Sequence, residues 1–316
     1  MNSPAISALS LTKRFRPDLP PAVDSLDFSI ATGESVAFLG PNGAGKSTTI
    51  KLLCGILLPD SGSASILGHA AGTREANRNL GLVFGARSQL YFHMTVEECL
   101  ALQAETYFVP RDEARKRIPK LAEIFGATKL LGRRVRELSL GERMRSELVA
   151  SLVHRPRVIL LDEPTIGLDV VAKLQLRESL RRWRREENTT LLLTSHDLSD
   201  VEALCDRSIL INHGKKAFDG KLCDARRAFG DRRRIRLTLS EEVPKELVIP
   251  AALTRSPAES EFEIRLEFDP KEIPLPEVFA WASSAFGSRL ADMQMGPIEL
   301  EEVIRKHYES PDLAVR

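Results

Sequence analysis

Short apolar runs recur along most of the chain and alternate with longer amphipathic stretches. The runs at 35–39 and 158–161 are apolar almost throughout, as strands buried on both faces of a sheet are. Strands are predicted near 6–11, 26–30, 35–39, 63–68, 79–84, 158–162, 190–195 and 208–212. Because these strands alternate with helical patterns, they predict an α/β fold with a parallel sheet and helices on both faces.

Two regions depart from this alternation. Between about 86 and 155 the strand pattern stops and helical patterns replace it, with Thr95 placed to cap one helix. Beyond Gly230, strands are expected at 234–239 and 261–268, and helices at 276–286 and 298–307. The pattern therefore predicts a large domain at 5–232 that contains a helical subdomain at about 86–155. A small accessory α+β domain is expected at 233–316.

One loop carries a strong chemical signal. The residues matching G-x-x-x-x-G-K-[ST] are Gly40, Pro41, Asn42, Gly43, Ala44, Gly45, Lys46, Ser47 and Thr48. They lie between a predicted strand and a predicted helix at about 46–57, the setting of a phosphate loop. Its backbone N–H groups and the helix N-terminus suit phosphate oxygens, Lys46 can reach the β- and γ-phosphates, and Ser47 can ligate Mg²⁺. This segment predicts binding of a nucleoside triphosphate.

Three further segments suggest what the bound nucleotide undergoes. The strand at 158–162 ends in Asp162, which can hold the Mg²⁺ shell, and Glu163, which can orient or deprotonate an attacking water. The strand at 191–195 leads to His196, predicted to contact the γ-phosphate. Ser139 and Gly141 begin an amphipathic helix whose N-terminus is a second anion-binding end. Its distance in sequence from the first indicates that it serves another phosphate.

The order GPNGAGKST, LSLGERMR, VILLDEPTIGLD, TSHD resembles the nucleotide-binding subunit of an ATP-binding cassette (ABC) transporter. The resemblance covers about residues 5–230. The wording LSLG-x-RMR together with DEPTIGLDVVAK resembles the exporter subgroup whose ATPase serves separate multi-span permeases. The fold implied is a P-loop cassette: a parallel nucleotide sheet, an antiparallel β edge and a helical subdomain that receives the permease's coupling helix.

The resemblance also implies individual roles and partners. Phe15 would stack on adenine, and Asp169 would be the D-loop residue that signals across a dimer interface. Ser139 and Gly141, in the family's signature motif with Glu142, would hold the γ-phosphate of ATP bound to a second ATP-binding subunit, expected to be another copy of this chain. The cofactors implied are ATP and Mg²⁺. The location implied is peripheral, on the cytoplasmic face of the membrane.

Two positions depart from the family's pattern. The family places a Gln shortly after the strand at 81–84, where it touches Mg²⁺ and the permease-facing groove, but this chain has Ala86 there and Gln89 three residues later. Gln89 is a candidate substitute. The signature's usual Gln is replaced by Glu142, whose charge would repel a γ-phosphate unless Arg143 or Arg145 offsets it. Both changes bear on the hydrolysis rate and on coupling.

Composition narrows the alternatives. Lys+Arg 45 against Asp+Glu 44 leaves a formal charge of +1, which gives no reason to expect nucleic acid as a partner. The four cysteines show no C-x-x-C spacing, so a metal cluster or disulfide framework is not expected. No apolar run approaches 18 residues and no signal segment precedes the first strand, so transport would require other chains.

The alternative function is a soluble ABC ATPase that acts on ribosomes or DNA. Ribosome-acting members resemble two fused cassettes, whereas this chain has one phosphate loop. Chromosome-type members carry a long coiled coil, and no heptads lie between Lys46 and Ser139.

Overall fold

The computed structural model describes residues 4–85, 88–195, 197–224, 233–244, 247–258 and 260–297. The chain divides into two compact units, Met1–Leu222 and Cys223–Arg316. The predicted boundary at 232/233 adjoins residues 225–232, which lie outside the described residues, and the domain limits stay a prediction. Each unit is considered by itself.

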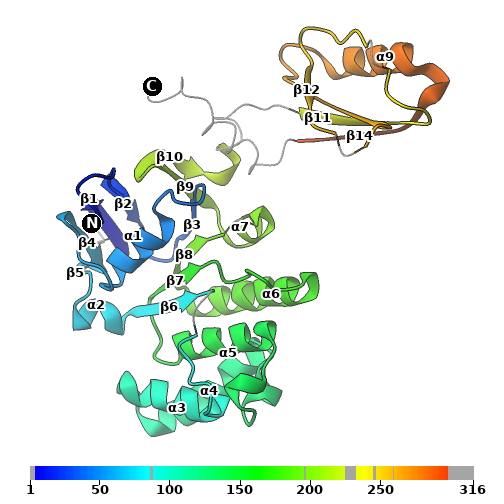
Figure 1. The fold of residues 1–316 in the computed structure, drawn as a ribbon. Coiled ribbons are helices and arrows are strands. Elements are labelled where there is room, and N and C mark those ends of the chain that lie inside the picture. Colours follow the sequence, from blue (N-terminus) through cyan, green and yellow to red (C-terminus); the bar gives the residue numbers. More distant parts are fainter. Residues whose placement is uncertain are drawn as a thin grey trace. The chain divides into compact units, whose positions relative to one another are not determined.

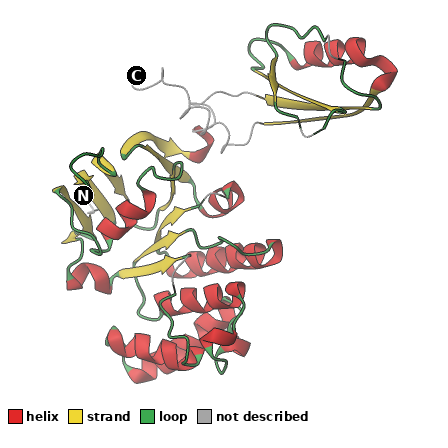
Figure 2. Cartoon of the chain, viewed as in Figure 1, coloured by secondary structure: helices red, strands yellow, loops and turns green. Residues whose placement is uncertain are grey.

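The first unit contains two sheets (Figures 1 and 2). The smaller is antiparallel, in the order β2-β1-β4-β5. Its strands are β1 (Ile6–Lys13), β2 (Val23–Ile30), β4 (Ser61–Ile66) and β5 (His69–Ala70). The larger has the order β10-β9-β3-β8-β7-β6. Its strands are β3 (Ser35–Leu39), β6 (Leu80–Phe84), β7 (Val158–Asp162), β8 (Thr190–Thr194), β9 (Arg207–Asn212) and β10 (Lys215–Lys221). All neighbours pair in parallel except β9 and β10.

The burial of the central strands explains their sequences. Every residue of β3, β7 and β8 is buried, which accounts for their continuous apolar runs. Strand β2, at the edge of the antiparallel sheet, instead alternates between buried and exposed positions. Helix α1 (Lys46–Leu53) contacts both β4 and β7 and so joins the two sheets around one apolar core. The parallel sheet with its antiparallel edge is thus confirmed.

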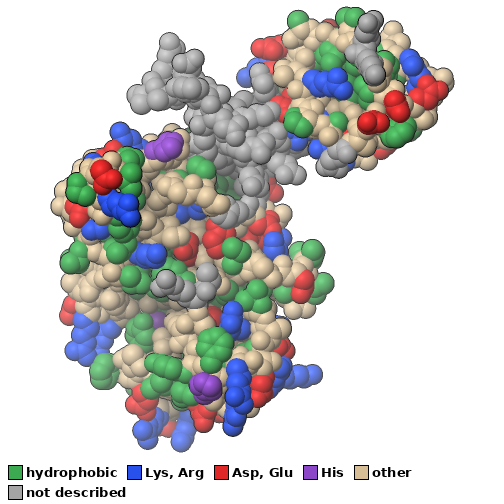
Figure 3. Space-filling model, in the orientation of Figure 1, with side chains coloured by type: hydrophobic (Ala, Val, Ile, Leu, Met, Phe, Trp, Pro, Cys, Tyr) green, Lys and Arg blue, Asp and Glu red, His purple; other side chains and the backbone are tan. Residues whose placement is uncertain are grey.

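Helices cover the rest of the first unit. They are α2 (Arg74–Arg78), α3 (Val96–Thr106), α4 (Arg111–Ile124), α5 (Leu140–Leu152), α6 (Val170–Glu187) and α7 (Leu198–Leu204), with short 3-10 turns η1 (Thr128–Leu130) and η2 (Val135–Glu137). Helices α3, α4 and α5 gather beyond the β6 edge of the sheet, as Figure 1 shows. Thr95 caps α3 and forms a capping box with Glu98. In Figure 3, side chains of both charge signs are interspersed over this helical part, in keeping with the balanced composition.

The second unit is a small α+β layer structure. Its sheet has the order β12-β13-β11-β14, with every neighbouring pair antiparallel. The elements are β11 (Arg233–Leu239), β12 (Thr254–Ser256), β13 (Glu263–Phe268), α9 (Leu275–Phe286), η3 (Gly287–Arg289) and β14 (Leu290–Pro297). Val278, Ala282 and Phe286 of α9 join the core of this sheet. The helix predicted at 298–307 lies outside the described residues.

The structure corrects the sequence prediction in two places. Helix α1 ends at Leu53 rather than near Leu57. Two residues later, Gly55 adopts φ +74°, and a Cβ there would lie 2.2 Å from the Cα of Gly72, so the chain turns away. Strands β5, β10, β12 and β14 were not predicted. Strand β14 contains Asp292, Gly296 and Pro297, residue types that disfavour strands, and it forms by pairing along the whole of β11.

Candidate functional site

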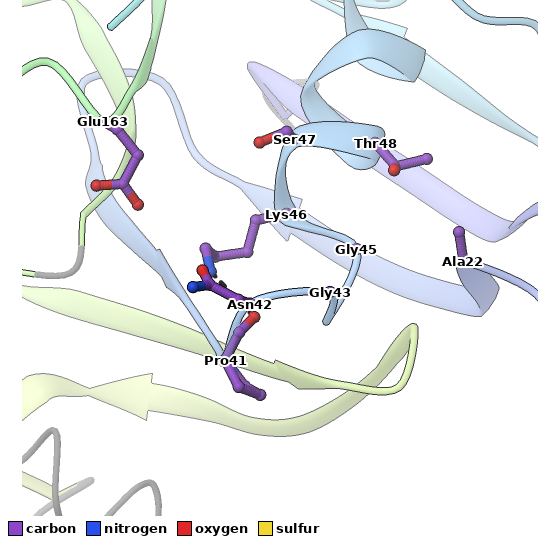
Figure 4. Close-up of a pocket in the computed structure, with 9 residues that line it drawn as sticks. All are labelled: Ala22, Pro41, Asn42, Gly43, Gly45, Lys46, Ser47, Thr48 and Glu163. Atoms are coloured by element: carbon purple, nitrogen blue, oxygen red, sulfur yellow. Dashed lines mark hydrogen bonds between the residues drawn. The ribbon is translucent and has the colours of Figure 1, made fainter. Parts of the chain in front are cut away.

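The phosphate loop forms a pocket of about 310 Å³ at the start of α1. Figure 4 shows the side chains that line it. The lining residues are Ala22, Pro41, Asn42, Gly43, Gly45, Lys46, Ser47, Thr48 and Glu163. Gly45 has φ +105°, and a Cβ on it would lie 2.3 Å from the carbonyl oxygen of Ala22. A glycine is therefore required where the loop passes the chain before β2. No motif in the sequence indicates that Ala22 belongs to the site.

Lys46 is held inside its own loop. Its Nζ donates to the carbonyl oxygens of Gly40 at 2.6 Å and Pro41 at 3.2 Å. Burial lowers the pKa of Lys46, and the charges of Glu163 and Asp162 act in the opposite direction. The ammonium group is thus positioned at the floor of a pocket that suits an anion.

Asp162 and Ser47 meet although they are far apart in sequence. The Ser47 hydroxyl donates to Asp162 Oδ1 at 3.2 Å, and the Thr194 hydroxyl donates to the same oxygen at 2.6 Å. Strands β7 and β8 are neighbours, so Thr194 braces the carboxylate from the adjacent strand end. A serine hydroxyl beside a carboxylate is a donor set of hard oxygens, which fits Mg²⁺. Within the described ranges no group of three or more His, Cys, Asp and Glu side chains could hold a metal.

Glu163 is fixed by its backbone. Its N–H donates to both the carbonyl oxygen and the hydroxyl oxygen of Thr194, each at 3.1 Å. Its φ of +55° lies in the left-handed region, which costs a non-glycine residue about 1–3 kcal/mol and often marks a functional position. The turn brings its side chain into the phosphate-loop pocket (Figure 4), where a carboxylate can orient or deprotonate a water.

A second pocket, of about 540 Å³, lies at the start of α5 and shares no lining residue with the first. Its lining residues are Ser139, Leu140, Gly141, Glu142, Arg145, Gly167, Leu168, Asp169, Val171, Ala172 and Gln175. The predicted signature residues and the predicted D-loop residue Asp169 therefore line the same pocket of one chain. Asp169 caps α6, accepting the N–H of Ala172 at 2.8 Å. A Cβ on Gly141 would lie 3.2 Å from that of Ala172.

The charge of Glu142 is offset differently from expectation. The expected partners were Arg143 and Arg145, but the ion pair is with Arg133, at 2.8 Å between Nη1 and Oε1. Arg143 lies over the ring of Phe92, and Arg145 reaches Gln175. Arg143, one position from Glu142, does not face it on the helix surface; Arg145, three positions away, could face it but reaches Gln175 instead. The ion pair of Glu142 is therefore with Arg133, and not with Arg143 or Arg145, the two candidates expected from the sequence.

Four predicted residues need separate mention. Phe15 follows β1 and is 60% exposed, outside the residues that line the first pocket. The Gln89 side-chain amide donates to the carbonyl oxygens of Leu82 at 3.3 Å and Glu147 at 3.2 Å. Gln89 does not line that pocket either. Ala86 and His196 lie outside the described residues, so their predicted roles stay predictions.

Sequence reasoning missed two buried carboxylates. Asp200, fully buried, accepts from the hydroxyls of Thr165 and Ser195 and from the guanidinium of Arg177. It ties the segment before Asp169 to the end of β8. An acidic residue in the first turn of α7 was the available signal, but its partners come from distant segments.

Glu147, in the middle of α5, is the other. It accepts from the Ser88 hydroxyl and from the Gln89 N–H at 3.1 Å. Burial raises the pKa of Glu147, while these hydrogen bonds lower it. The helix that carries the signature is therefore joined to the segment after β6.

Comparison with known proteins agrees with this geometry. The model of the ABC transporter family matches residues 23–166. The ABC transporter ATP-binding protein NatA of Bacillus subtilis (strain 168) is 36% identical over 203 residues, which are 64% of this chain and 82% of that protein. The sn-glycerol-3-phosphate import ATP-binding protein UgpC 1 of Rhizobium etli is 35% identical over 212 residues, which are 67% of this chain and 60% of that protein.

A solved structure described as the ATP-binding subunit of an ABC transporter superposes with a TM-score of 0.64 at 29% identity. The match covers 71% of this chain and 93% of that one. In the part of the chain that the structure describes, none of the helices has the length and apolar character needed to cross a bilayer. The phosphate loop and Glu163 line one pocket, and the buried Asp162 is hydrogen-bonded to Ser47 of that loop. The chain belongs to the ABC transporter family as an ATP-binding subunit, and it is an ATPase.

Proposed function

We propose that this ATPase drives separate multi-span permease subunits, from the cytoplasmic face of the membrane, and that the cargo is exported. The observation that carries the proposal is the presence of two helix N-termini in two pockets without a common lining residue. One pocket holds the complete phosphate loop. The other, with Ser139 and Gly141, is suited to a phosphate that this chain does not itself bind.

Several side chains have a proposed part in ATP binding and hydrolysis. Lys46 contacts the β- and γ-phosphates, and Ser47 with Asp162 would hold Mg²⁺, which supplies charge neutralisation when bound. Glu163 orients or deprotonates the attacking water. We assign His196 to the γ-phosphate, because it follows a buried strand of the same sheet, and Phe15 to the adenine ring, on the resemblance to the family.

The second pocket implies assembly. A complete site requires two chains arranged head to tail, so that Ser139 and Gly141 of one copy meet the ATP held by the other. Asp169 adjoins the signature in the same pocket and would lie at the interface. Residues 233–316 would form an accessory domain.

Export is supported by the wording of the signature and D-loop segments, which resembles the exporter subgroup. Overall sequence similarity does not distinguish export from import, because UgpC 1 is named as an import protein and is 35% identical to this chain. Direction therefore has its own experiment, below.

The assembly is tested with Glu163→Gln protein, which should bind ATP without consuming it. Light scattering should show a shift from monomer to dimer when Mg-ATP is added, and no shift with Mg-ADP. A monomer at saturating Mg-ATP would contradict the head-to-tail site.

Partner and direction are tested in cells of the source organism. Tagged protein extracted from membranes should co-purify with a multi-span protein. Small molecules and lipids are then compared between cells and medium in strains with the parent chain or with Glu163→Gln. A compound that accumulates in the Glu163→Gln cells and disappears from their medium indicates export, and the reverse indicates import.

A further inference from the structure

Glu142 places a negative charge at a helix end that the proposed function assigns to a phosphate. The carboxylate is only about a quarter exposed. One oxygen accepts the N–H of Ser139 at 2.8 Å, and the N–H of Glu142 in turn donates to Ser139 Oγ at 3.3 Å. The pair forms a capping box. The carboxylate is therefore held beside the hydroxyl proposed to contact ATP.

This arrangement leaves specific donors for a phosphate. The Ser139 hydroxyl accepts one hydrogen bond and keeps its proton available for donation. The N–H of Gly141 has no acceptor within the helix, because it belongs to the first turn. The donors remain, but a fixed negative charge lies next to them, and like charges in one site repel.

Arg133 is placed to cancel that charge. Its Nη1 donates to Glu142 Oε1 at 2.8 Å, and its Nη2 donates to the carbonyl oxygen of Glu137 at 2.6 Å. One guanidinium thus joins the carboxylate to the turn that leads into Ser139. The N–H of Ser139, followed by the contacts with Arg133, lowers the pKa of Glu142, so the glutamate stays charged and the compensation must come from a cation.

We infer that Arg133 is a positioning residue of the signature end: it neutralises Glu142 and so allows a glutamate to stand where the family has a glutamine. The inference rests on the proposed function, in which Ser139 and Gly141 meet the ATP of a second copy. Without Arg133, the uncompensated Glu142 faces the phosphates and the ATP-bound dimer weakens. With glutamine at position 142, Arg133 becomes dispensable.

The experiment is a double-mutant cycle in the Glu163→Gln protein, read as the Mg-ATP concentration that gives half-maximal dimer in light scattering. Arg133→Ala should raise this midpoint by roughly tenfold or more at low salt, because like charges brought together at an interface are strongly unfavourable. Glu142→Gln removes the carboxylate charge, and its own midpoint is the reference for the second half of the cycle. The combination of Arg133→Ala with Glu142→Gln should lie within about threefold of Glu142→Gln alone.

Two matched variants and a salt series separate charge from structure. Arg136→Ala removes the same charge from an exposed position three residues away and should leave the midpoint unchanged. Arg133→Lys keeps the charge and should stay close to the parent. In 0.5 M salt the Arg133→Ala defect should shrink, since a partly exposed charge is screened.

Each result that would contradict the inference can be recognised separately. If the double variant is as weak as Arg133→Ala, or if salt has no effect, Arg133 only braces the turn through Glu137 and the inference fails. If Arg133→Ala matches the parent, it fails as well. A parent protein that stays monomeric with Mg-ATP overturns both the proposed assembly and the inference, whereas a dimerising parent confines the failure to Arg133.

Discussion

The two helices that begin at the proposed phosphate sites have N-termini of opposite character. Helix α1 starts after Gly45, with no side-chain cap, no acidic residue in its first turn and Lys46 as its first residue. Helix α5 starts after Ser139, which is capped reciprocally by Glu142. The first end is open and positive, whereas at the second end the carboxylate of Glu142 already accepts the N–H of the capping Ser139.

This difference shows how one chain can contain two anion-binding sites with different functions. The open end of α1 binds a phosphate directly, using its N–H groups and the ammonium of Lys46. The capped end of α5 is stable without a ligand because its carboxylate satisfies a backbone donor. Its net charge is set by Arg133 from outside the helix. We therefore expect the first end to govern nucleotide affinity and the second to govern assembly.

The largest expected effect lies in the pocket of α1 but does not concern affinity. Glu163→Gln should slow ATP hydrolysis by roughly 10²–10⁴, because it removes the proposed base while its amide keeps the side-chain shape. Steady-state turnover and equilibrium ATP binding are measured together, with Glu178→Gln on the exposed face of α6 as the control. Turnover within threefold of the parent would rule out Glu163 as the base.

Two variants, one at each helix N-terminus, test whether α1 and α5 have different functions. Lys46→Ala should weaken ATP binding to the isolated chain by roughly tenfold to a hundredfold, since it removes a charge-assisted contact of about 1.5–3 kcal/mol. Ser139→Ala should leave that affinity within about twofold and abolish ATP-driven dimerisation instead. Calorimetric titration and light scattering on the same samples give both readouts. Equal losses of ATP affinity in the two variants would contradict the proposal that α1 governs nucleotide affinity and α5 governs assembly.

A third prediction concerns the buried carboxylate of Glu147, which anchors α5 to the segment after β6. Glu147→Ala should lower the free energy of unfolding by roughly 1–3 kcal/mol, because Ser88 and the Gln89 N–H lose a buried acceptor. Glu147→Gln keeps an acceptor and removes a carboxylate whose pKa burial raises, so its effect should be smaller. Ser146→Ala, next to Glu147 on the same helix and bonded only to the carbonyl of Glu142 among the contacts described, is the matched control. Urea unfolding distinguishes them, and equal losses in all three would contradict a specific anchor.

The smallest expected effect is a pH dependence of ATP affinity that arises at the N-terminus of α1. Burial lowers the pKa of Lys46, so its ammonium loses its proton at a lower pH than an ordinary lysine, and ATP affinity should fall as the pH rises from 7 toward 9.5. The fall should be smaller than the loss expected for Lys46→Ala, because a neutral amine still donates a hydrogen bond. In Lys46→Arg, whose guanidinium remains charged, the affinity should not change over this range even if it is lower throughout. A flat profile in the parent would show that Lys46 keeps its proton.

Local chemistry explains why the phosphate loop was predictable. Its glycines, Lys46 and Ser47 are contiguous, and the neighbouring apolar strand and helix give the segment its geometry. The buried strands β3, β7 and β8 were equally readable, because full burial requires continuous apolar runs. The Thr95 cap depends only on residues within one turn.

Other features depend on segments that meet only after folding. The antiparallel strand β14 has weak intrinsic preference and is formed by its partner β11. Asp200 gathers Thr165, Ser195 and Arg177 from three elements. No periodicity in the sequence reports such contacts, since each requires the relative placement of separate elements.

The sequence by itself determined that this chain folds around a phosphate loop and presents Asp162 and Glu163 at a strand end, because those signals lie in contiguous residues. The tertiary structure decided which charges meet. Arg143 and Arg145 are near Glu142 in sequence, yet Arg133 makes the ion pair. The folded chain places the segment that carries Arg133 next to the first turn of α5. Ion pairs depend on side-chain direction over a few ångströms, and only the packed chain sets that direction.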